Sequence, residues 1–482
     1  MDAVLVGFIV YLLLVLVAGA ATYRLTQTQE DFLLAGRRLN IWVATFSERA
    51  SGESAWLLLG LPAAAATVGL VESWAAIGCV TGIMAAWFFV ASGLRRETER
   101  VEAMTLPEFF ARKFGEHAAP IRVVAAAIII FFYAFYLAAQ FNGAGAVLEA
   151  TFGIDRFVGM VIGASVIILY TMMGGFFAVA WTDFLQALIM IGTLVVLPIV
   201  GLLELSHHQA SFPLSPDVRS WTGSATGLAG VAAVISGLSW GFGYCGQPHT
   251  VTRFMSIDRP KHIRIGRIIA FFWAAPAFAG ALAIGLIGAQ LFDVSALEQA
   301  GTIEQLMPLM AKDLLPAWLA GIFVSGAVAA MMSTADSQLL VGTSAVAEDV
   351  IHRGFGVKLG HKGLVVLSRW VTVILGVAAF VLAASSETLI FTLVSYAWSG
   401  LGSSFGPAIL LTLHWRRTTG LGVLVGMVTG ATVTVVWSWL PLNDLIHARL
   451  VSFVLAALSV VGVSLLGPRK TSGPGQRTEA AG

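Results

Sequence analysis

Long runs of apolar residues, separated by short polar segments, recur along the whole chain. A helix needs about 20 mostly apolar residues to cross the hydrocarbon core of a bilayer, and thirteen stretches are long enough. The pattern predicts an all-α integral membrane protein with about thirteen transmembrane helices. These helices are expected near residues 3–22, 41–67, 72–94, 121–148, 156–175, 178–204, 227–252, 266–292, 315–345, 365–386, 390–413, 420–440 and 447–467.

The composition agrees with a lipid environment. Apolar residues make up 57% of the 482 positions and charged residues only 11%, whereas a soluble domain has about 25% charged residues. The net charge of +1 gives no reason to expect nucleic-acid binding. Cys79 and Cys245 lie in different apolar runs, so they suggest neither a disulfide nor a metal site. The first run, 1–23, lacks the pattern of a cleaved signal peptide, and we expect a retained helix.

Lysine and arginine residues are distributed unequally between the predicted loops. If the N-terminus lies outside, 23 of the 28 basic residues fall in cytoplasmic loops, including those between 95 and 122 and Arg253. Four fall in outside loops, including Lys312 and Arg449, and Arg49 lies within a span. Cytoplasmic loops of membrane proteins are enriched in Lys and Arg. We therefore expect a multi-pass protein of the cell's inner (plasma) membrane, functional as a monomer, with its N-terminus outside and its C-terminus in the cytoplasm.

Two of the predicted spans are interrupted by polar, Gly and Pro residues. The second contains ASGES at 50–54, and the seventh contains SWGFGYCGQPH at 239–249. Transporters often bind their substrates where helices break at matching positions of two inverted repeats. The breaks suggest a LeuT-like core of two five-helix halves, and glycines that only allow close helix packing are the alternative. The expected parts of a single transporter domain, 1–470, are an extra helix (1–23), a first repeat (41–204), a second repeat (227–414) and added helices (420–467), followed by a disordered cytoplasmic tail (471–482).

The stretch SERASGESAW places three charged residues inside the second span. Glu48 and Arg49 are expected to pair with each other or with cytoplasmic loops. Glu53 sits at the break itself. Its carbonyl is a candidate ion ligand, and its side chain is expected to meet the solute, a proton or the protein interior.

The ninth span carries a set of candidate cation ligands in AMMSTADSQ, residues 330–338. Ala330, Ser333 and Ser337 share one helix face because they are three and four residues apart. Sodium prefers oxygen ligands, and carbonyls freed at the break near Ala50 would add to the hydroxyls. Ser and Thr hydroxyls often bond only to their own helix. A carboxylate such as Asp336 inside a span is nevertheless expected to be functional.

The same expectation applies to Asp183 in AVAWTDFLQA of the sixth span. This motif, with ASGESAWLLLGLP, WGFGYCGQPH and MMSTADSQLLV, resembles the sodium/solute symporter family, most of all its sodium/proline branch. The resemblance extends from about residue 5 to 465, and the early QEDFLLAGRRL is similar as well. It implies thirteen helices, an inverted-repeat core with broken helices 2 and 7, and sodium-driven uptake of a small organic solute.

The resemblance also implies roles for particular residues. A main sodium site would use carbonyls of Ala50, Glu53 and Ala330 with hydroxyls of Ser333 and Thr334. A second sodium site, which some members of the family have, would use Asp183, Ser333, Asp336 and Ser337. Contacts with a proline-like solute would fall on Ser54, Trp56, Tyr136, Trp240, Tyr244 and Pro248.

One departure leaves the solute and the number of ions open. The proline branch has Asp-Met where this chain has Gly52-Glu53. Proline is the first expectation, and another amino acid, a monocarboxylate, or a sugar or sialic acid are alternatives. No catalytic set or metal spacing among the nine histidines points to an enzyme. A channel and a membrane sensor are the other classes that we considered.

Overall fold

The computed structural model of the protein describes residues 3–23, 29–207, 211–357, 359–385 and 388–467. Over these residues the chain is mostly helical and has no strand, only one isolated backbone bridge between Leu39 and Ile257. The tail predicted to be disordered, 471–482, lies outside the described residues. The predicted all-α architecture is confirmed.

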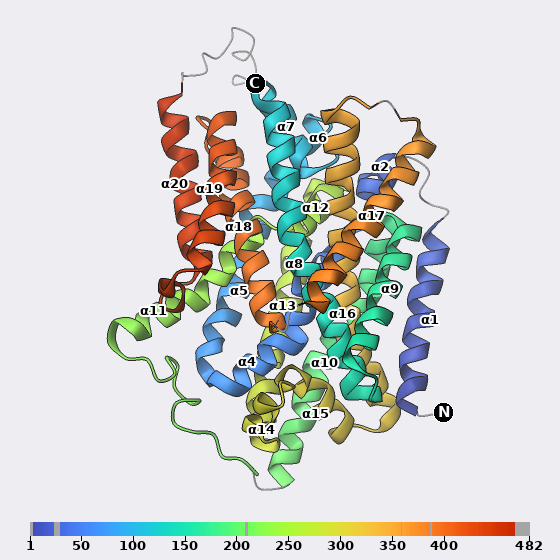
Figure 1. The fold of residues 1–482 in the computed structure, drawn as a ribbon, viewed down its shortest axis with the longest axis vertical. Coiled ribbons are helices and arrows are strands. Elements are labelled where there is room, and N and C mark those ends of the chain that lie inside the picture. The colour runs from blue at the N-terminus through green and yellow to red at the C-terminus, as the bar shows by residue number, and fades with distance from the viewer. Residues whose placement is uncertain (1–2, 24–28, 208–210, 358, 386–387, 468–482) are drawn as a thin grey trace.

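Helices occupy all thirteen apolar segments, close to the predicted bounds (Figure 1). The main helices are α1 (Ala3–Tyr23), α3 (Ile41–Ala55), α4 (Leu61–Val68), α5 (Ser73–Ala85), α6 (Ala91–Arg100), α8 (Ala118–Phe152), α9 (Arg156–Gly174), α10 (Phe176–His207), α11 (Gly227–Leu238), α12 (Pro248–Ser256), α13 (Ile263–Leu291), α16 (Ala317–Ser344), α17 (His361–Ala384), α18 (Ile390–His414), α19 (Gly420–Ser438) and α20 (Ala448–Leu466). Shorter helices lie in the connections: α2 (Gln29–Leu34), α7 (Leu106–Lys113), α14 (Val294–Gln299) and α15 (Leu306–Leu314).

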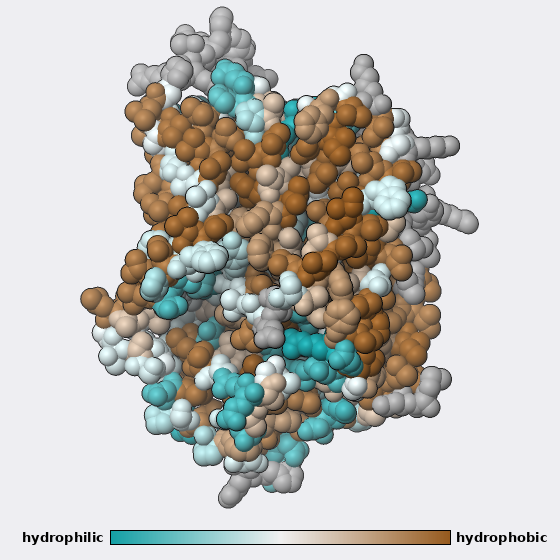
Figure 2. Space-filling model, in the orientation of Figure 1, coloured by the Kyte–Doolittle hydropathy of each residue, from teal (hydrophilic) through white to brown (hydrophobic). Residues whose placement is uncertain are grey.

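The outer surface of this helical bundle is apolar. Large side chains such as Leu14, Phe272 and Ile374 remain exposed, and apolar surface covers most of the face in Figure 2. Soluble proteins rarely expose apolar patches of this extent. Among the described residues, nine helical segments are long and apolar enough to cross a membrane, and one of them, Ile41–Arg100, holds two predicted spans. The protein is thus a multi-pass membrane protein. The number of membrane crossings, thirteen, and the division into two repeats stay predictions.

The breaks predicted in the second and seventh spans are both present. The backbone of α3 is interrupted at Ser54, whose φ of 50° and ψ of −172° are far from helical values. A wide turn, η2 (Trp56–Gly60), then leads into α4. In the seventh segment, α11 ends at Leu238 and a tight 3-10 stretch, η6 (Ser239–Cys245), precedes Pro248 at the start of α12.

The two broken segments are tied together at one end. Leu39, just before α3, donates its amide to the carbonyl of Ser256 at 3.2 Å and accepts the amide of Asp258 at 3.0 Å. Nε of Arg95 in α6 donates to the carbonyl of Ile257 at 2.6 Å. The start of α3 and the end of α12 therefore share a fixed anchor.

The 3-10 stretch η6 is packed against α5 and α18 at very short range. A Cβ atom at Gly82 of α5 would lie 2.2 Å from the carbonyl oxygen of Gly241, and one at Gly243 would lie 1.8 Å from Nε1 of Trp398. These separations are well inside van der Waals contact. Only glycine lets the irregular backbone of the break lie between two helices, so these glycines combine flexibility with close packing.

Loops predicted to lie on opposite sides of the membrane lie at opposite ends of the molecule. In Figure 1, α6 and α7 are at the upper end, and α14 and α15 are at the lower end. The segment from α6 to α7 was predicted to be cytoplasmic, and the segment with α14 and α15 was predicted to be outside. The predicted alternation of the loops agrees with this arrangement. The end that faces the cytoplasm stays a prediction.

Two arginines that the loop count placed in water are buried. Arg253 is fully buried in α12, and Arg449 is 5% exposed. The guanidinium of Arg449 lies 4.2 Å from the ring centroid of Trp240 and donates to the hydroxyl of Ser395. The loop assignments were wrong because partners inside the protein, Asp183 in the case of Arg253, satisfy each charge.

The close contact between α5 and η6 generates a prediction about stability. Gly82→Ala should lower the melting temperature of the purified protein, because the added methyl group must displace the backbone at Gly241; overpacking of this kind costs about 1–3 kcal/mol. Gly192→Ala is the matched control, since a Cβ there meets nothing within 4 Å. Thermal unfolding followed by size-exclusion chromatography measures both variants, and equal melting temperatures would contradict the packing argument.

Candidate ion and solute site

The break in α3 brings backbone oxygens next to hydroxyl groups of α16. Oγ of Ser333 donates to the carbonyl oxygen of Ala50 at 3.1 Å and to that of Ala330 at 3.2 Å. Oγ1 of Thr334 donates to the carbonyl oxygen of Ser51 at 3.1 Å. All five residues are buried. Their oxygens form a compact all-oxygen set between two helices, which is the ligand type that a hard cation such as sodium prefers.

Most of the residues predicted for the main sodium site therefore lie together. Ala50, Ala330 and Ser333 are in direct contact, whereas Thr334 reaches the carbonyl of Ser51 rather than that of Glu53. The carbonyl of Glu53 accepts the amide of Trp56. The assignment of these residues as sodium ligands stays a prediction.

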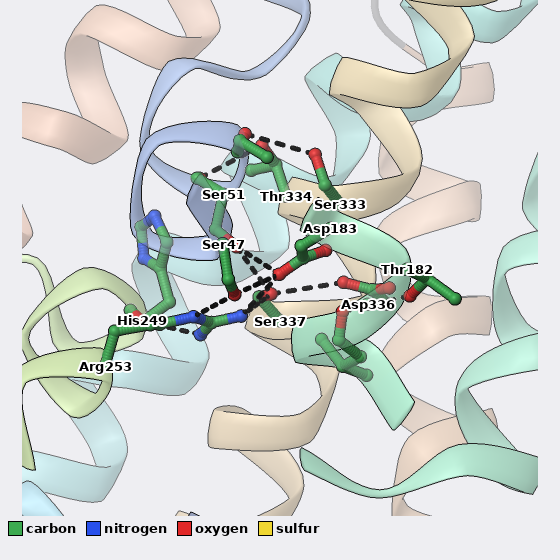
Figure 3. A network of polar contacts seen from close by, with 12 residues as sticks. Ser47, Ser51, Thr182, Asp183, His249, Arg253, Ser333, Thr334, Asp336 and Ser337 are labelled. Carbon is green, nitrogen blue, oxygen red and sulfur yellow. Dashed lines mark hydrogen bonds and ion pairs between the residues drawn. The ribbon is translucent and has the colours of Figure 1, made fainter. Parts of the chain in front are cut away.

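Asp183 of α10 is the centre of a second polar network (Figure 3). Its Oδ2 accepts hydrogen bonds from Ser47 at 2.6 Å, from Ser51 at 2.9 Å and from Nη2 of Arg253 at 3.0 Å. All four residues are buried. Three helices, α3, α10 and α12, thus meet at a single carboxylate oxygen.

Ser337 of α16 completes this network. Its hydroxyl accepts a hydrogen bond from Arg253, lies 3.0 Å from the hydroxyl of Ser51, and donates to Oδ1 of Asp336 at 3.1 Å. The structure thus brings together Asp183, Asp336 and Ser337, which were predicted as a second sodium site. Ser333, the fourth predicted member, is engaged with Ala50 instead. A guanidinium group that the sequence analysis did not include lies among them.

The three charges of the second span form a buried ion cluster on the other side of α3. Nε of Arg49 contacts Oε2 of Glu48 at 2.6 Å, and its Nη1 contacts Oε1 of Glu53 at 2.7 Å. Nε1 of Trp87 donates to Glu48 at 3.1 Å, and the hydroxyl of Tyr244 donates to Glu53 at 3.0 Å. The expected pairing of Glu48 with Arg49 is confirmed, and Glu53 joins it rather than standing alone in the interior.

The aromatic residues predicted to contact the solute gather around the same break. Trp56 and Trp240 are stacked, with ring centroids 4.5 Å apart and planes inclined by 7°. The hydroxyl of Tyr136 donates to Ser54 at 3.5 Å, and Tyr244 packs edge-on against Trp398 at 4.6 Å. All of these side chains are buried. The indole groups therefore lie on each other, and a solute that binds between them has to separate them.

Pro248 is the remaining residue of the predicted solute set. It opens α12, and its carbonyl accepts the hydroxyl of Thr252 at 2.6 Å. Nothing links it by a hydrogen bond to the other predicted solute residues within the described part of the chain. Its role in the structure is to start the half-helix, and a solute contact stays a prediction.

Sequence reasoning missed two residues that complete the site. Oε1 of Gln140 accepts the amide of Ala55 at 3.0 Å, so this side chain satisfies the backbone at the break. Arg253 holds the network around Asp183. Signals for both were available, because Gln140 is a polar residue in an otherwise apolar span and Arg253 lies within two helical turns of Pro248.

Comparison with known proteins identifies the family. Residues 32–430 match the model of the sodium:solute symporter family. The chain belongs to this family. The resemblance inferred from the four motifs is confirmed, and the protein is a transporter rather than an enzyme.

The relatives and a solved structure cover almost the entire symporter. The sodium/proline symporter of Escherichia coli (strain K12) is 36% identical over 472 residues, 96% of this chain and 93% of that protein. The high-affinity proline transporter PutP of Bacillus subtilis (strain 168) is 35% identical over 455 residues, 94% of this chain and 95% of that protein. A Na+-coupled sialic acid symporter, solved in a substrate-bound outward-open state, matches with a TM-score of 0.76 at 18% identity, over 97% of this chain and 99% of that one. This likeness confirms the LeuT-like fold.

The ion cluster of α3 generates a prediction about folding. Arg49→Met should strongly destabilise the protein, because it leaves Glu48 and Glu53 buried without their counter-charge; breaking a buried pair costs about 3–5 kcal/mol. Arg100→Met is the control, since Arg100 pairs with Glu97 at the surface with 64% of its side chain exposed, where a pair contributes about 0–1 kcal/mol. Yield of monodisperse protein and melting temperature are the measurements. A normal melting temperature for Arg49→Met would show that the cluster does not stabilise the fold.

Proposed function

We propose that the protein is a sodium-driven symporter that carries proline into the cell. The curated relatives that match nearly the whole chain include proline transporters from two bacteria. In this proposal the protein has three partners: the solute proline, the co-transported sodium ion and the lipid bilayer. The two five-helix repeats, 41–204 and 227–414, would form the two sides that alternate access to the site.

The observation that carries the proposal is the meeting of α3 and α16. The hydroxyl of Ser333 lies within 3.2 Å of two carbonyl oxygens, one freed at the break and one from its own helix. In this proposal sodium binds among Ala50, Ala330, Ser333 and Thr334, with Glu53 contributing its carbonyl. Because the ion contacts both helices, its binding stabilises one arrangement of the break. Any solute that favours that arrangement then raises the affinity for sodium, and sodium raises the affinity for the solute by the same factor.

The aromatic cluster supports a compact solute with a carboxylate. Nε1 of Trp56 is buried and has no hydrogen-bond partner among the described residues, so it is free to donate to an acceptor on a ligand. Buried unpaired donors are costly, which makes this indole a fitting partner for a carboxylate. Trp240 and Tyr244 would cover an apolar ring such as that of proline. Another small amino acid is the second candidate, because Glu53, which departs from the proline branch, adds a carboxylate beside Tyr244.

The proposed orientation follows from the distribution of basic residues. The upper end in Figure 1, with α6 and α7, would face the cytoplasm, and the N-terminus would be outside. We further propose that a single chain is the functional unit, because the proposed ion and solute residues all come from one chain.

Removing the hydroxyl ligands tests the sodium site. Ser333→Ala combined with Thr334→Ala should raise the sodium concentration for half-maximal uptake of labelled proline by at least about tenfold in proteoliposomes, because each lost oxygen contact is worth about 1 kcal/mol or more. Ser325→Ala is the matched control, since Ser325 lies in the same helix and, among the described residues, donates only to the carbonyl of Gly321, at 2.7 Å. Uptake by the double variant with unchanged sodium dependence would overturn the proposed site.

The solute and the class of protein are tested in the same vesicles. Counterflow should exchange labelled proline for unlabelled proline, which a channel or a sensor would not do, and the solute should remain chemically unaltered, unlike an enzyme's substrate. A panel of other amino acids, monocarboxylates and sugars added as competitors ranks the solutes. If proline neither exchanges nor competes while another amino acid does, the second candidate replaces the first.

The orientation is tested by labelling single cysteines. In a variant without Cys79 and Cys245, Glu298→Cys should react with a membrane-impermeant maleimide in intact cells, whereas Arg417→Cys should react only after permeabilisation. Both positions are exposed at the surface. Labelling with the opposite sidedness would invert the proposed topology.

A further inference from the structure

We infer that the guanidinium of Arg253 is a built-in cation in the place of a second sodium, so that the protein binds and moves one sodium ion per transport cycle. This inference rests on the proposed sodium-coupled function and concerns its stoichiometry. It starts from the observation that two of the residues expected to hold a second sodium, Asp183 and Ser337, already contact a positive charge (Figure 3).

Arg253 uses the oxygens that a second sodium would need. Its Nη2 contacts Oδ2 of Asp183 at 3.0 Å and also donates to the hydroxyl of Ser337. Both of these residues belong to the set predicted for the second ion. The other acceptor positions of that carboxylate oxygen are filled by the hydroxyls of Ser47 and Ser51. An ion entering this network would have to displace several hydrogen bonds at once.

The guanidinium is fixed in this position by further contacts. Its Nη1 donates to the carbonyl of His249 at 2.7 Å, its Nε donates to the hydroxyl of Ser47 at 3.1 Å, and its Cζ lies 5.0 Å from the ring centroid of Phe176. Arg253 is fully buried. An arginine with planar, directional donors is well suited to such a fixed role, and moving it away would leave its charge without partners in the protein interior.

The remaining free oxygens do not make a sodium site. Oδ1 of Asp183 and Oδ2 of Asp336 are buried without hydrogen-bond partners among the described residues. Two oxygens fall well short of the roughly six ligands that hard cations usually take. A sodium ion placed beside them would also be repelled by the neighbouring guanidinium in a site that excludes water. The compact oxygen set around Ser333, which contains no cationic side chain, is the place that remains for an ion.

One sodium per cycle sets the limit of accumulation. Proline carries no net charge, so the charge moved per solute equals the number of sodium ions. At a membrane potential of 100 mV and a tenfold sodium gradient, one ion sustains a solute ratio of roughly a few hundred, and two ions would square that ratio. The difference is large enough to measure.

The deciding experiment counts bound sodium directly. Equilibrium binding of 22Na+ to the purified protein, in the presence of saturating proline, should give one ion per chain, and the ratio of 22Na+ to labelled proline taken up by proteoliposomes should also be one. A value of two in the wild type overturns the inference while leaving sodium-coupled transport intact. If no sodium binds, the proposed function itself fails.

Two substitutions of Arg253 test whether its charge, rather than the size of its side chain, excludes a second sodium. Arg253→Met removes the charge at similar length and should open the network to a second sodium, raising the count from one to two. Arg253→Lys keeps a positive charge and should stay at one. If Arg253→Met is folded, as judged by size-exclusion chromatography, and still binds one sodium, the inference is overturned. Should that variant not fold, the wild-type count decides the question alone.

Discussion

A helix that breaks inside a bilayer frees amide and carbonyl groups that no water or lipid can satisfy. In this protein α3 breaks at Ser54, whose backbone departs from helical geometry, so the groups freed there need partners within the protein. The amide of Ala55 is satisfied by the side chain of Gln140, and carbonyls just before the break accept hydroxyls of Ser333 and Thr334. The hydroxyl contacts that help to satisfy the break therefore also gather oxygen atoms, the ligand type that a hard cation prefers.

The buried charged residues of the core form two clusters, one on each side of α3. One side of α3 carries hydroxyls that converge with α10, α12 and α16 on Asp183, and the other side carries Arg49 with two glutamates. The guanidinium of Arg49 is shared by two carboxylates, and that of Arg253 pairs with Asp183 and reaches Asp336 through the hydroxyl of Ser337. Buried ions of this kind are stable only when each is paired and hydrogen-bonded. Arg49 neutralises two carboxylates within α3 itself, whereas Arg253 joins α12 to α10 and, through the hydroxyl of Ser47, to α3. A shift of α3 would therefore break its hydrogen bonds to the network around Asp183.

The sequence was sufficient for features that depend on local pattern. Apolar length located the helices, and clustered glycine and proline located the breaks at 50–54 and 239–249. Helical spacing placed Ser333 and Ser337 on one face of α16. It was not sufficient for features that depend on which helix lies opposite. Arg253 was assigned to a loop because its partner is 70 residues away in the chain, and the stacking of Trp56 on Trp240 depends on how two breaks meet. The position of a residue within its own helix predicts which way its side chain points, but it does not predict which helix lies opposite.

The proposed coupling between ion and solute has a short structural path. The proposed ion residues and the residues that would meet the solute are separated by only a few positions of α3: Ala50 contacts Ser333, and Glu53 contacts Tyr244 of the second break. In the structure, hydroxyls of α16 donate directly to the carbonyls of α3. A cation bound at the proposed site would require those hydroxyls to turn their lone pairs toward it, so the hydrogen bonds between the helices would be exchanged for ion contacts. In the proposed mechanism the ion would then set the position of α3, and the Glu53–Tyr244 contact would carry that change to the aromatic residues around Trp240.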